Sequence, residues 1–407
     1  MGLFRNKQYI SEGSLSRLAL KRLLKDKFVI ISAAVVILAV LVAILGYLIT
    51  PDQTPFANGQ ILELSCRKPG FSIKMLLLNR SETPSSAAWP VRMFWGEKSN
   101  YRSVPIISYH FENDKIVVKA YTGGNRYDGP ELRFNLSEVL YGVKISVKGM
   151  KSPGEFVKVA GSGKQSLAIA ALQNKVVKQN IKTRHYWLGT DRYGRDVLSQ
   201  LMIGARVSLS VGFISVAISL LIGLLLGSIA GFFGCRTDAL IMWLINVVWS
   251  IPTLLLVIAI TFALGKGFWQ VFIAVGLTMW VEVARVVRGQ FLSIREKEYV
   301  EAGKALGFSN PRLIFRHILP NTLAPVIVIS AANFASAILI EAGLSFLGVG
   351  VQPPMPSWGT MIKDNYGYII LDSAYLAILP GLAIMIMVLA FMLIGNGLRD
   401  ALDVKAS

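Results

Sequence analysis

Few residues of this chain combine a type and a setting that could carry chemistry. Glu282 and Glu341 are carboxylates at the edges of long apolar runs, where an ionisable group is costly and usually faces a cavity or a partner. No Ser or His stands in a pattern typical of a nucleophile and its base. Three His and two Cys are too few for a recognisable metal site or a disulfide framework. The sequence therefore predicts no catalytic residue, bound cofactor or metal in this chain.

One segment looks like a phosphate loop. Residues 161–165 read GSGKQ, with the glycines and lysine of such a loop. The pattern also requires Gly where this chain has Lys158, and Ser or Thr where it has Gln165. We therefore expect no nucleotide site there.

The composition explains why ionisable residues are scarce. Only 16% of the 407 residues are charged, and the mean hydropathy is +0.53. A wholly soluble chain is excluded. Lys and Arg exceed Asp and Glu by 42 to 24. In so apolar a chain this excess indicates basic residues around membrane spans rather than nucleic-acid binding.

Six charge-free runs are long enough, or nearly so, to cross a membrane. At 1.5 Å per residue the first run reaches about 33 Å, which exceeds the thickness of a hydrocarbon core, about 30 Å. It is also longer than the apolar region of a typical cleaved signal peptide. The fourth is short, so its helix must continue through Glu282. The runs are 28–49, 207–235, 239–265, 267–281, 317–340 and 373–398.

Basic residues set the orientation of these spans. Seven Lys or Arg precede the first span, and seven more lie in 285–316. The positive-inside rule places both segments in the cytoplasm, and an even number of spans returns the C-terminus there. Glu282 should then pair with Arg285 or Arg288 at the cytoplasmic boundary. Glu341 either faces the pathway or a partner in the outer half of the membrane, or emerges into water at its helix end.

Small and helix-breaking residues mark the spans. Three glycines recur at every fourth position of the second span, and predict close packing of a neighbouring helix. They are Gly223, Gly227 and Gly231. Three prolines interrupt apolar runs, either to kink spans that line a pathway or merely because proline is common in membrane helices. They are Pro252, Pro325 and Pro380.

Residues 51–184 differ in composition and form an insert that should lie outside the cytoplasm. Alternating patterns predict strands at 61–64, 73–78 and 143–148, and two strands within 106–121 around Asn113. A short helix is expected in 161–182. We therefore predict a small β-rich domain, whose role is not readable from the sequence.

The segment 296–320, EKEYVEAGKALGFSNPRLIFRHILP, predicts two short polar helices between two spans. Gly307 is placed to stop the first, and Ser309-Asn310-Pro311 to begin the second. Four apolar side chains need cover, which points to a cytoplasmic protein partner or, alternatively, to the lipid headgroups. They are Tyr299, Val300, Leu306 and Phe308.

This segment resembles the EAA loop of bacterial ABC importer permeases. The matching residues are Glu301, Ala302, Gly303, Gly307 and Pro320, although the family has Ala where this chain has Gly303. Two further stretches narrow the resemblance to permeases of the dipeptide and oligopeptide C type: 188–209, LGTDRYGRDVLSQLMIGARVSL, and 341–359, EAGLSFLGVGVQPPMPSWG. The resemblance implies that the loop docks on an ATP-hydrolysing subunit.

The first of these stretches holds a glycine-punctuated charged turn at the outer surface. It either contacts a substrate-delivery protein or the partner permease, or forms local ion pairs that anchor the second span. The residues are Asp191, Arg192, Gly194, Arg195 and Asp196.

Taken together, the sequence predicts an all-α bundle of six transmembrane helices with a β-rich extracytoplasmic insert between the first two. The expected parts are a cytoplasmic segment 1–27, a first span 28–50, the insert 51–184, and a core 185–403 with the coupling loop 285–320. The resemblance implies a permease subunit of an ATP-driven importer of peptides or similar solutes in the bacterial inner membrane, and not an enzyme. It implies two ATP-binding subunits that use the ATP, a second related permease and an extracytoplasmic binding protein as partners.

Two other interpretations remain open at this stage. An ion-coupled secondary transporter would work alone, but it would need more ionisable residues within the spans. A membrane-anchored receptor would bind a ligand through the insert, but it would leave the polar helical hairpin unexplained.

Overall fold

The computed structural model describes residues 21–80, 88–124, 129–142, 157–158, 166–167, 169–265 and 267–402. The predicted strand at 143–148, the loop at 161–165 and three of the seven basic residues of the N-terminal flank lie outside these residues. Contacts divide the chain into two compact units. The helical unit comprises Met1–Ala43, Gly204–Asp364 and Ala377–Ser407, and the sheet unit comprises Ile44–Ile203 and Asn365–Leu376.

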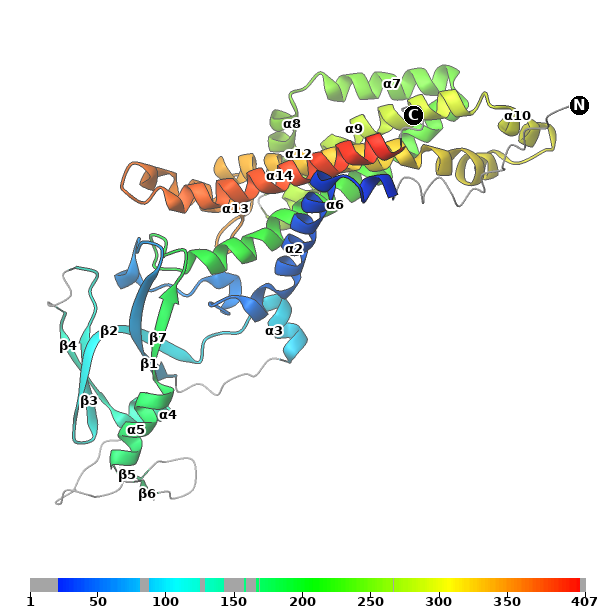
Figure 1. The fold of residues 1–407 in the computed structure, drawn as a ribbon. Coiled ribbons are helices and arrows are strands. Elements are labelled where there is room, and N and C mark those ends of the chain that lie inside the picture. The colour runs from blue at the N-terminus through cyan, green and yellow to red at the C-terminus, as the bar shows by residue number, and fades with distance from the viewer. Residues whose placement is uncertain are drawn as a thin grey trace, which may run out of the picture. The chain divides into compact units, whose positions relative to one another are not determined.

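Five helices in the described part of the chain are long and apolar enough to cross a membrane (Figure 1). Each covers most of one predicted charge-free run, and α9 continues past Glu282 as its short run required. Within the helical unit, α9 packs against α12. The five are α2 (Lys27–Ile49), α6 (Val197–Phe233), α9 (Phe268–Ile294), α12 (Leu319–Phe346) and α14 (Tyr375–Leu402).

The predicted span 239–265 is not one straight helix. It forms α7 (Cys235–Trp249) and α8 (Thr253–Leu264), which meet at 92°. Pro252 stands at the break, where it lacks the N–H that a continuous helix would use. The described chain thus has five membrane-length helices, or six if the bent pair is one span. Pro325 and Pro380, by contrast, lie inside α12 and α14, which continue past them.

The glycines of α6 bring it against α9. A Cβ at Gly223 would lie 2.5 Å from Val283, and one at Gly227 would lie 2.5 Å from the carbonyl oxygen of Ala284. Real side-chain carbons are not found so close to neighbouring atoms. The sequence prediction of close packing along this stripe is therefore confirmed.

We expect Gly227→Ala to destabilise the protein by about 1–3 kcal/mol, because α6 and α9 must separate to admit the methyl group. Gly289→Ala on α9 is the matched control, since no described residue outside its own stretch of helix lies within 4 Å of its Cβ position. That change should stabilise the helix by up to about 1 kcal/mol. Thermal unfolding of the detergent-solubilised protein measures both, and equal effects would contradict the packing described.

The sheet unit holds a five-stranded antiparallel sheet in the order β4-β3-β2-β1-β7 (Figure 1). Two helices, α4 (Leu136–Tyr141) and α5 (Ile169–Gln179), share a buried core with one face of the sheet, in which Leu76, Val104 and Val176 are enclosed. The strands are β1 (Phe71–Asn79), β2 (Tyr101–Glu112), β3 (Lys115–Ala120), β4 (Glu131–Asn135) and β7 (Ile181–Tyr186). A short helix α3 (Trp89–Trp95) and the paired strands β5 (Val157–Lys158) and β6 (Ser166–Leu167) complete the unit.

Most local predictions in this unit are confirmed. The strand expected at 73–78 is β1, and the two expected within 106–121 are parts of β2 and β3, which meet at a turn where Asn113 has φ +53°. The expected short helix is α5. The strand at 61–64 is wrong: Leu62–Leu64 is a 3-10 helix, because its backbone pairs with the 190–193 segment instead of the sheet.

Candidate functional site

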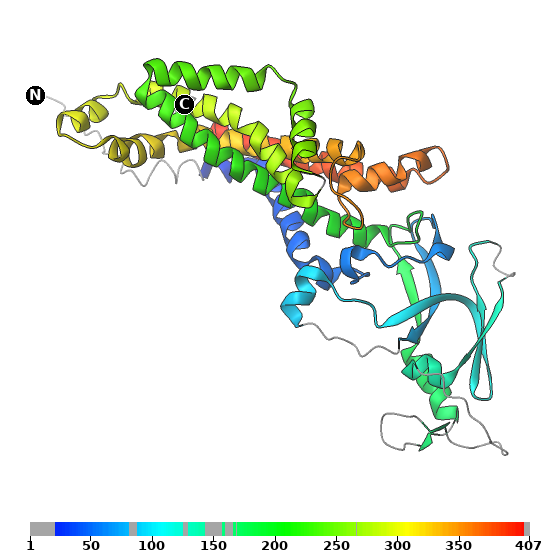
Figure 2. The same ribbon diagram turned by 180° about the vertical axis from the view of Figure 1, so that it is seen from behind.

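The polar hairpin between α9 and α12 consists of α10 (Glu298–Ala305), a turn, α11 (Asn310–Arg312) and a π-helical turn, Leu313–Ile318. Gly307 has φ +77°, a left-handed conformation that favours glycine, and its N–H donates to the Lys304 carbonyl at 3.0 Å. Ser309 occupies the N-cap position of α11, but its side chain forms no capping bond. The first predicted short helix is confirmed as α10, but the second is not separate, because Asn310–Phe346 forms one continuous helix that includes α12. Figure 2 shows the hairpin, in olive, beyond the ends of α9 and α12.

The inner side of the hairpin is joined to the spans. Val300 is fully buried in a cluster with α9 residues such as Phe291 and with Ile314 and Ile318. The expectation that Val300 needs cover from a partner is therefore wrong, because this chain supplies it. Gly303 is also buried, and a Cβ there would lie 2.9 Å from Leu313. This close contact is a physical reason for Gly303 at a position where the family has Ala.

The outer side of the hairpin is exposed. Tyr299 and Ala302 of α10 are followed at helical spacing by Leu306, the residue that caps its C-terminus, and Leu306 is 74% exposed. Glu301 is exposed on the same helix, and Pro320 is exposed in the first turn of α12. The expectation of uncovered apolar side chains is confirmed for Tyr299 and Leu306. Phe308 instead stacks on His317, with ring centroids 5.4 Å apart.

Phe315 belongs to the same exposed apolar set, and the sequence reasoning missed it. Its side chain is 62% exposed in the π-helical turn that follows α11. A helical wheel drawn from α-helical spacing gives no signal for this position, because the π turn changes the residue's angle on the helix. We call Tyr299, Leu306 and Phe315 the hairpin patch.

Glu341 lies in α12 and is completely buried. Ser345 donates a hydrogen bond to its Oε1 at 2.7 Å, and Ser208 of α6 donates one to its Oε2 at 3.2 Å. The expectation that Glu341 emerges into water is therefore wrong. The carboxyl group instead joins α6 to α12 in the helical unit.

Two of the stretches that resemble the family, 188–209 and 341–359, meet around Glu341. Ser357, next to α13 (Trp358–Asn365), lies 3.5 Å from the Ser345 hydroxyl. Gly359 approaches α12 so closely that a Cβ would lie 2.7 Å from Ala342 Cα, and one at Gly204 would lie 3.2 Å from Trp358. Residues 204–208 of the first stretch and 341–359 of the second thus form one packed centre, which does not include the hairpin.

A cavity of about 340 Å³ lies beside the break between α7 and α8. Glu282 of α9 lines it together with Trp249 and with residues of α8 and α12. The expected pairing of Glu282 with Arg285 or Arg288 is not found among the described residues. Arg288 instead binds Asp238 of α7, with Nη2 2.6 Å from Oδ2, and the guanidinium group of Arg285 lies 3.5 Å from the centre of the Trp249 ring.

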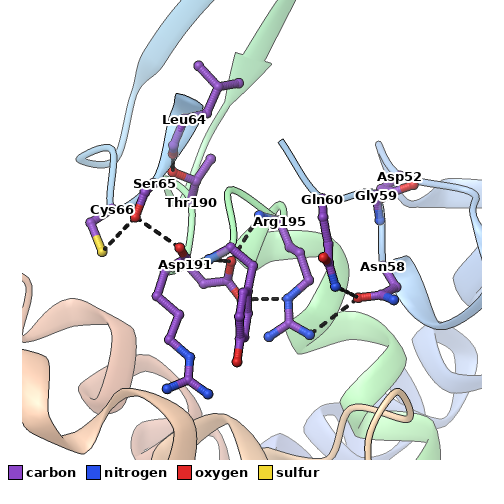
Figure 3. A network of polar contacts seen from close by, with 12 residues as sticks. Asp52, Asn58, Gly59, Gln60, Leu64, Ser65, Cys66, Thr190, Asp191 and Arg195 are labelled. Carbon is purple, nitrogen blue, oxygen red and sulfur yellow. Dashed lines mark hydrogen bonds and ion pairs between the residues drawn. The ribbon is translucent and has the colours of Figure 1, made fainter. Parts of the chain in front are cut away.

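The charged turn lies in the sheet unit between β7 and α6 (Figure 3). Asp191 is only 1% exposed. Its Oδ1 accepts hydrogen bonds from the backbone N–H groups of Tyr193 and Arg195, both at 2.9 Å, and its Oδ2 accepts one from Arg195 Nε at 2.6 Å. Gly194 completes the turn with φ +71°. The carboxylate therefore organises the turn from within.

Further bonds attach this turn to the segment that precedes β1 (Figure 3). The Thr190 hydroxyl donates to the Leu64 carbonyl and accepts from the Arg67 N–H at 2.8 Å. The Ser65 hydroxyl donates to the Arg192 carbonyl at 2.9 Å. The guanidinium group of Arg192 lies 4.5 Å from the centre of the Tyr193 ring. This geometry favours the anchoring interpretation of the motif over the docking interpretation.

Asp196 ends the turn and is buried. Its Oδ2 accepts bonds from both the N–H and the hydroxyl of Ser199 in the first turn of α6. Burial raises the pKa of the Asp196 carboxyl group above its ordinary value of 3.8, and the Ser199 bonds only partly oppose this. The folded protein therefore holds a proton on Asp196 more readily than the unfolded chain.

This pKa shift predicts a pH dependence of stability. The contribution from protonated Asp196 is fully present below about pH 4 and is lost as pH rises through the raised pKa. Melting temperatures of Asp196→Asn should therefore fall less between pH 4 and pH 7 than those of the unmodified protein. Thermal unfolding at four pH values measures the difference, and parallel curves would contradict the shift.

Comparisons with known proteins place these features in a family. The family model described as binding-protein-dependent transport system inner membrane component matches residues 223–407, and that of the N-terminal TM domain of oligopeptide transport permease C matches residues 14–62. The dipeptide transport system permease protein DppC of Alkalihalophilus pseudofirmus is 44% identical over 220 residues, which cover 54% of this chain and 72% of that protein. The oligopeptide transport system permease protein OppC of Bacillus subtilis is 41% identical over 223 residues, covering 55% and 73%.

Among solved structures, the inward-facing MetNI methionine ABC transporter is similar, with a TM-score of 0.42 and 20% identity, covering 50% of this chain and 96% of that one. An amino acid ABC transporter is similar with a TM-score of 0.37 and 18% identity, covering 49% and 92%.

The membrane-length helices of the described residues, two of which are joined by a polar hairpin, indicate a multi-span membrane protein. The chain belongs to the family of binding-protein-dependent transport system inner membrane components, in its oligopeptide and dipeptide permease C branch. It is a permease subunit of an ABC importer, and in such systems ATP is hydrolysed by separate subunits.

Proposed function

We propose that this chain forms half of the translocation pathway of a peptide importer in the bacterial inner membrane. The names of its relatives, a dipeptide and an oligopeptide permease, support peptides as the cargo. The other half would be a second, related permease. Two ATP-binding subunits would act from the cytoplasm, and an extracytoplasmic binding protein would deliver the cargo. This chain itself would bind no cofactor, and its partners would use the ATP.

The hairpin carries the proposed link to ATP hydrolysis. Its exposed patch of Tyr299, Leu306 and Phe315 offers apolar contact to another protein, with Glu301 beside it. Val300 and Ile314 bury the opposite side of the hairpin against the end of α9. Because packed cores transmit displacement rather than absorb it, a push on the patch moves α9 and α12 together. This rigid seating is the single observation that carries the proposed coupling role.

The orientation proposed for the membrane rests on the basic residues around the hairpin. Residues 285–316 hold seven Lys or Arg, which favours the cytoplasm. With the N-terminus also cytoplasmic, this orientation requires the bent pair of α7 and α8 to act as one crossing. The C-terminus would then be cytoplasmic, and the sheet unit's insert would lie outside. The charged turn would hold this outer segment in place, and Glu341 would fix α6 to α12 beside the pathway.

Reconstitution tests the proposed cargo and partners. The chain, its second permease and its ATP-binding subunits are placed in proteoliposomes with the binding protein, and uptake of a radiolabelled tripeptide is followed. We expect uptake that requires both ATP and the ATP-binding subunits. Uptake driven by a proton gradient in the absence of the ATP-binding subunits would contradict the proposal.

A second role is favoured for the insert by a cleft of about 1300 Å³ within the sheet unit. Five basic residues line it, whereas two of its three acidic residues, Asp52 and Glu97, are bonded to nearby groups of the protein. Such a surface attracts anionic groups. The basic residues are Arg80, Lys98, Arg102, Lys182 and Arg184. We propose that the insert binds an anionic ligand. Uptake that retains its salt dependence and rate after Lys98→Glu and Arg102→Glu would contradict this role.

A further inference from the structure

The cavity beside the break between α7 and α8 presents an ionisable group without a counterion. Glu282 lines it from α9, a membrane-length helix, and forms no ion pair within the described part of the chain. The side chain of Glu282 is exposed, and an ionisable residue within a membrane-length helix usually faces a cavity or a partner. The other lining residues include Trp249, Thr253, Thr278, Ser336 and Leu339.

The basic groups nearest along α9 are already engaged. Arg288 forms two hydrogen bonds to Asp238 of α7. Arg285, which is nearer to Glu282 in the sequence, lies with its guanidinium group over the Trp249 ring. Arg285 follows Glu282 by less than one helical turn, yet their charged groups do not come within 4.0 Å of each other. Neither arginine thus forms an ion pair with this carboxylate.

The remaining walls suit a small peptide. Thr253, Thr278 and Ser336 line the cavity, and most of the other lining residues are apolar. The Thr278 hydroxyl donates to the Val275 carbonyl oxygen at 2.8 Å. Ligand pockets are typically apolar, with a few polar groups that fix orientation, and their volumes begin at about 300 Å³. A volume of about 340 Å³ is therefore sufficient for the end of a short peptide but not for a folded partner.

We infer that this cavity is a cargo-binding site in the permease, in which Glu282 binds an ammonium group of the passing peptide. The inference rests on the proposed function, because peptides supply such a group at the amino terminus or on a lysine side chain. A carboxylate-ammonium hydrogen bond in a partly enclosed site is among the stronger polar contacts. Losing it should weaken binding about tenfold or more.

Protection of an engineered thiol tests the site without the binding protein, which selects peptides on its own. Ser336→Cys places the thiol on an exposed lining residue, and alkylation at position 336 is followed by mass spectrometry in the assembled permease and ATP-binding complex. A free-amine tripeptide should slow alkylation. In a chain that also carries Glu282→Gln, the peptide concentration that halves the rate of alkylation should be at least tenfold higher. Glu131→Gln, on the exposed start of β4, is the control and should leave protection unchanged.

Two further peptides identify the source of the cation. An N-acetylated neutral tripeptide should give no protection, and an N-acetylated peptide with one lysine should protect only if the side-chain ammonium can replace the terminal one. Equal protection in the Glu282 and Glu282→Gln proteins overturns the inference. So does failure of the Glu282→Gln chain to assemble, which would show that Glu282 pairs with a partner subunit.

Failure of the inference is distinguishable from failure of the proposed function. If the same complex imports peptides with the binding protein present but no peptide protects position 336, the cavity site is wrong and the peptide importer stands. If the complex imports no peptide, the proposed cargo is wrong, and the inference falls with it.

Discussion

Replacing Gly307 by proline should reduce ATP-driven uptake at least tenfold while the chain still inserts into the membrane. Gly307 has φ +77°, whereas proline is fixed near −65° and has no N–H to donate to the Lys304 carbonyl. The strain, of order 3 kcal/mol, would be relieved by reorienting α10 and with it the hairpin patch. ATP hydrolysis by the partner subunits should continue without transport. Uptake and ATP hydrolysis are measured together in proteoliposomes.

Gly307→Asn is the matched control for this change. Asparagine tolerates the left-handed region, and no atom lies within 4 Å of the Cβ position at Gly307. We expect this variant to keep most of its coupled uptake. Proline and asparagine variants with the same ratio of uptake to hydrolysis would show that the turn geometry does not matter for coupling.

Gly194→Ala should prevent the sheet unit from folding correctly. A Cβ at this position would lie 1.7 Å from the carbonyl oxygen of Ile61, and the residue also has φ +71°. The obstacle is backbone, so no side-chain rotation relieves it. The turn must open, and the buried Asp191 carboxylate then loses its N–H donors. We expect a loss of at least about 3 kcal/mol of stability, measured as loss of folded protein after solubilisation.

Gly70→Ala separates this collision from backbone strain. Gly70 has φ +83°, close to that of Gly194, but no atom lies within 4 Å of its Cβ position. Gly70→Ala should lose only the stability that the left-handed backbone conformation costs a residue with a Cβ, about 1–2 kcal/mol. Equal losses for the two variants would contradict the close approach of the turn to Ile61.

How far the fold could be predicted depends on the range of the interactions. The spans were readable because a lipid interior demands about 20 apolar residues in a row, and that demand is local. The turns at Asn113 and Gly307 were also readable, since each depends on the backbone preference of one residue. For the bend between α7 and α8, Pro252 indicates the position in the sequence. The 92° angle could not be predicted, because it depends on packing.

Strand β7 had no signal in the sequence. Ile181–Tyr186 contains Lys182, Arg184 and His185, and it lies at an edge of the sheet, where charged residues are typical. Its place is set by pairing with β1, which is remote along the chain. An apolar alternation therefore could not reveal it.

The candidate sites show the same division. The hairpin patch was largely predicted, because α-helical spacing places Tyr299 and Leu306 on one side of α10. The centre at Glu341 was not, because Ser208 is 133 residues away in the sequence. Nor could the sequence reveal that Arg288 pairs with Asp238, 50 residues away, rather than with Glu282. In each case a residue was recognised by its type, but its partner was chosen by the fold.

Photo-cross-linking from position 306 tests the central claim most directly. Leu306, the most exposed member of the hairpin patch, is replaced by a photoreactive phenylalanine analogue in intact cells, and the adducts are identified by mass spectrometry. We predict a major adduct with an ATP-binding subunit. Adducts confined to an extracytoplasmic protein would place the hairpin on the opposite side of the membrane and contradict its role in coupling.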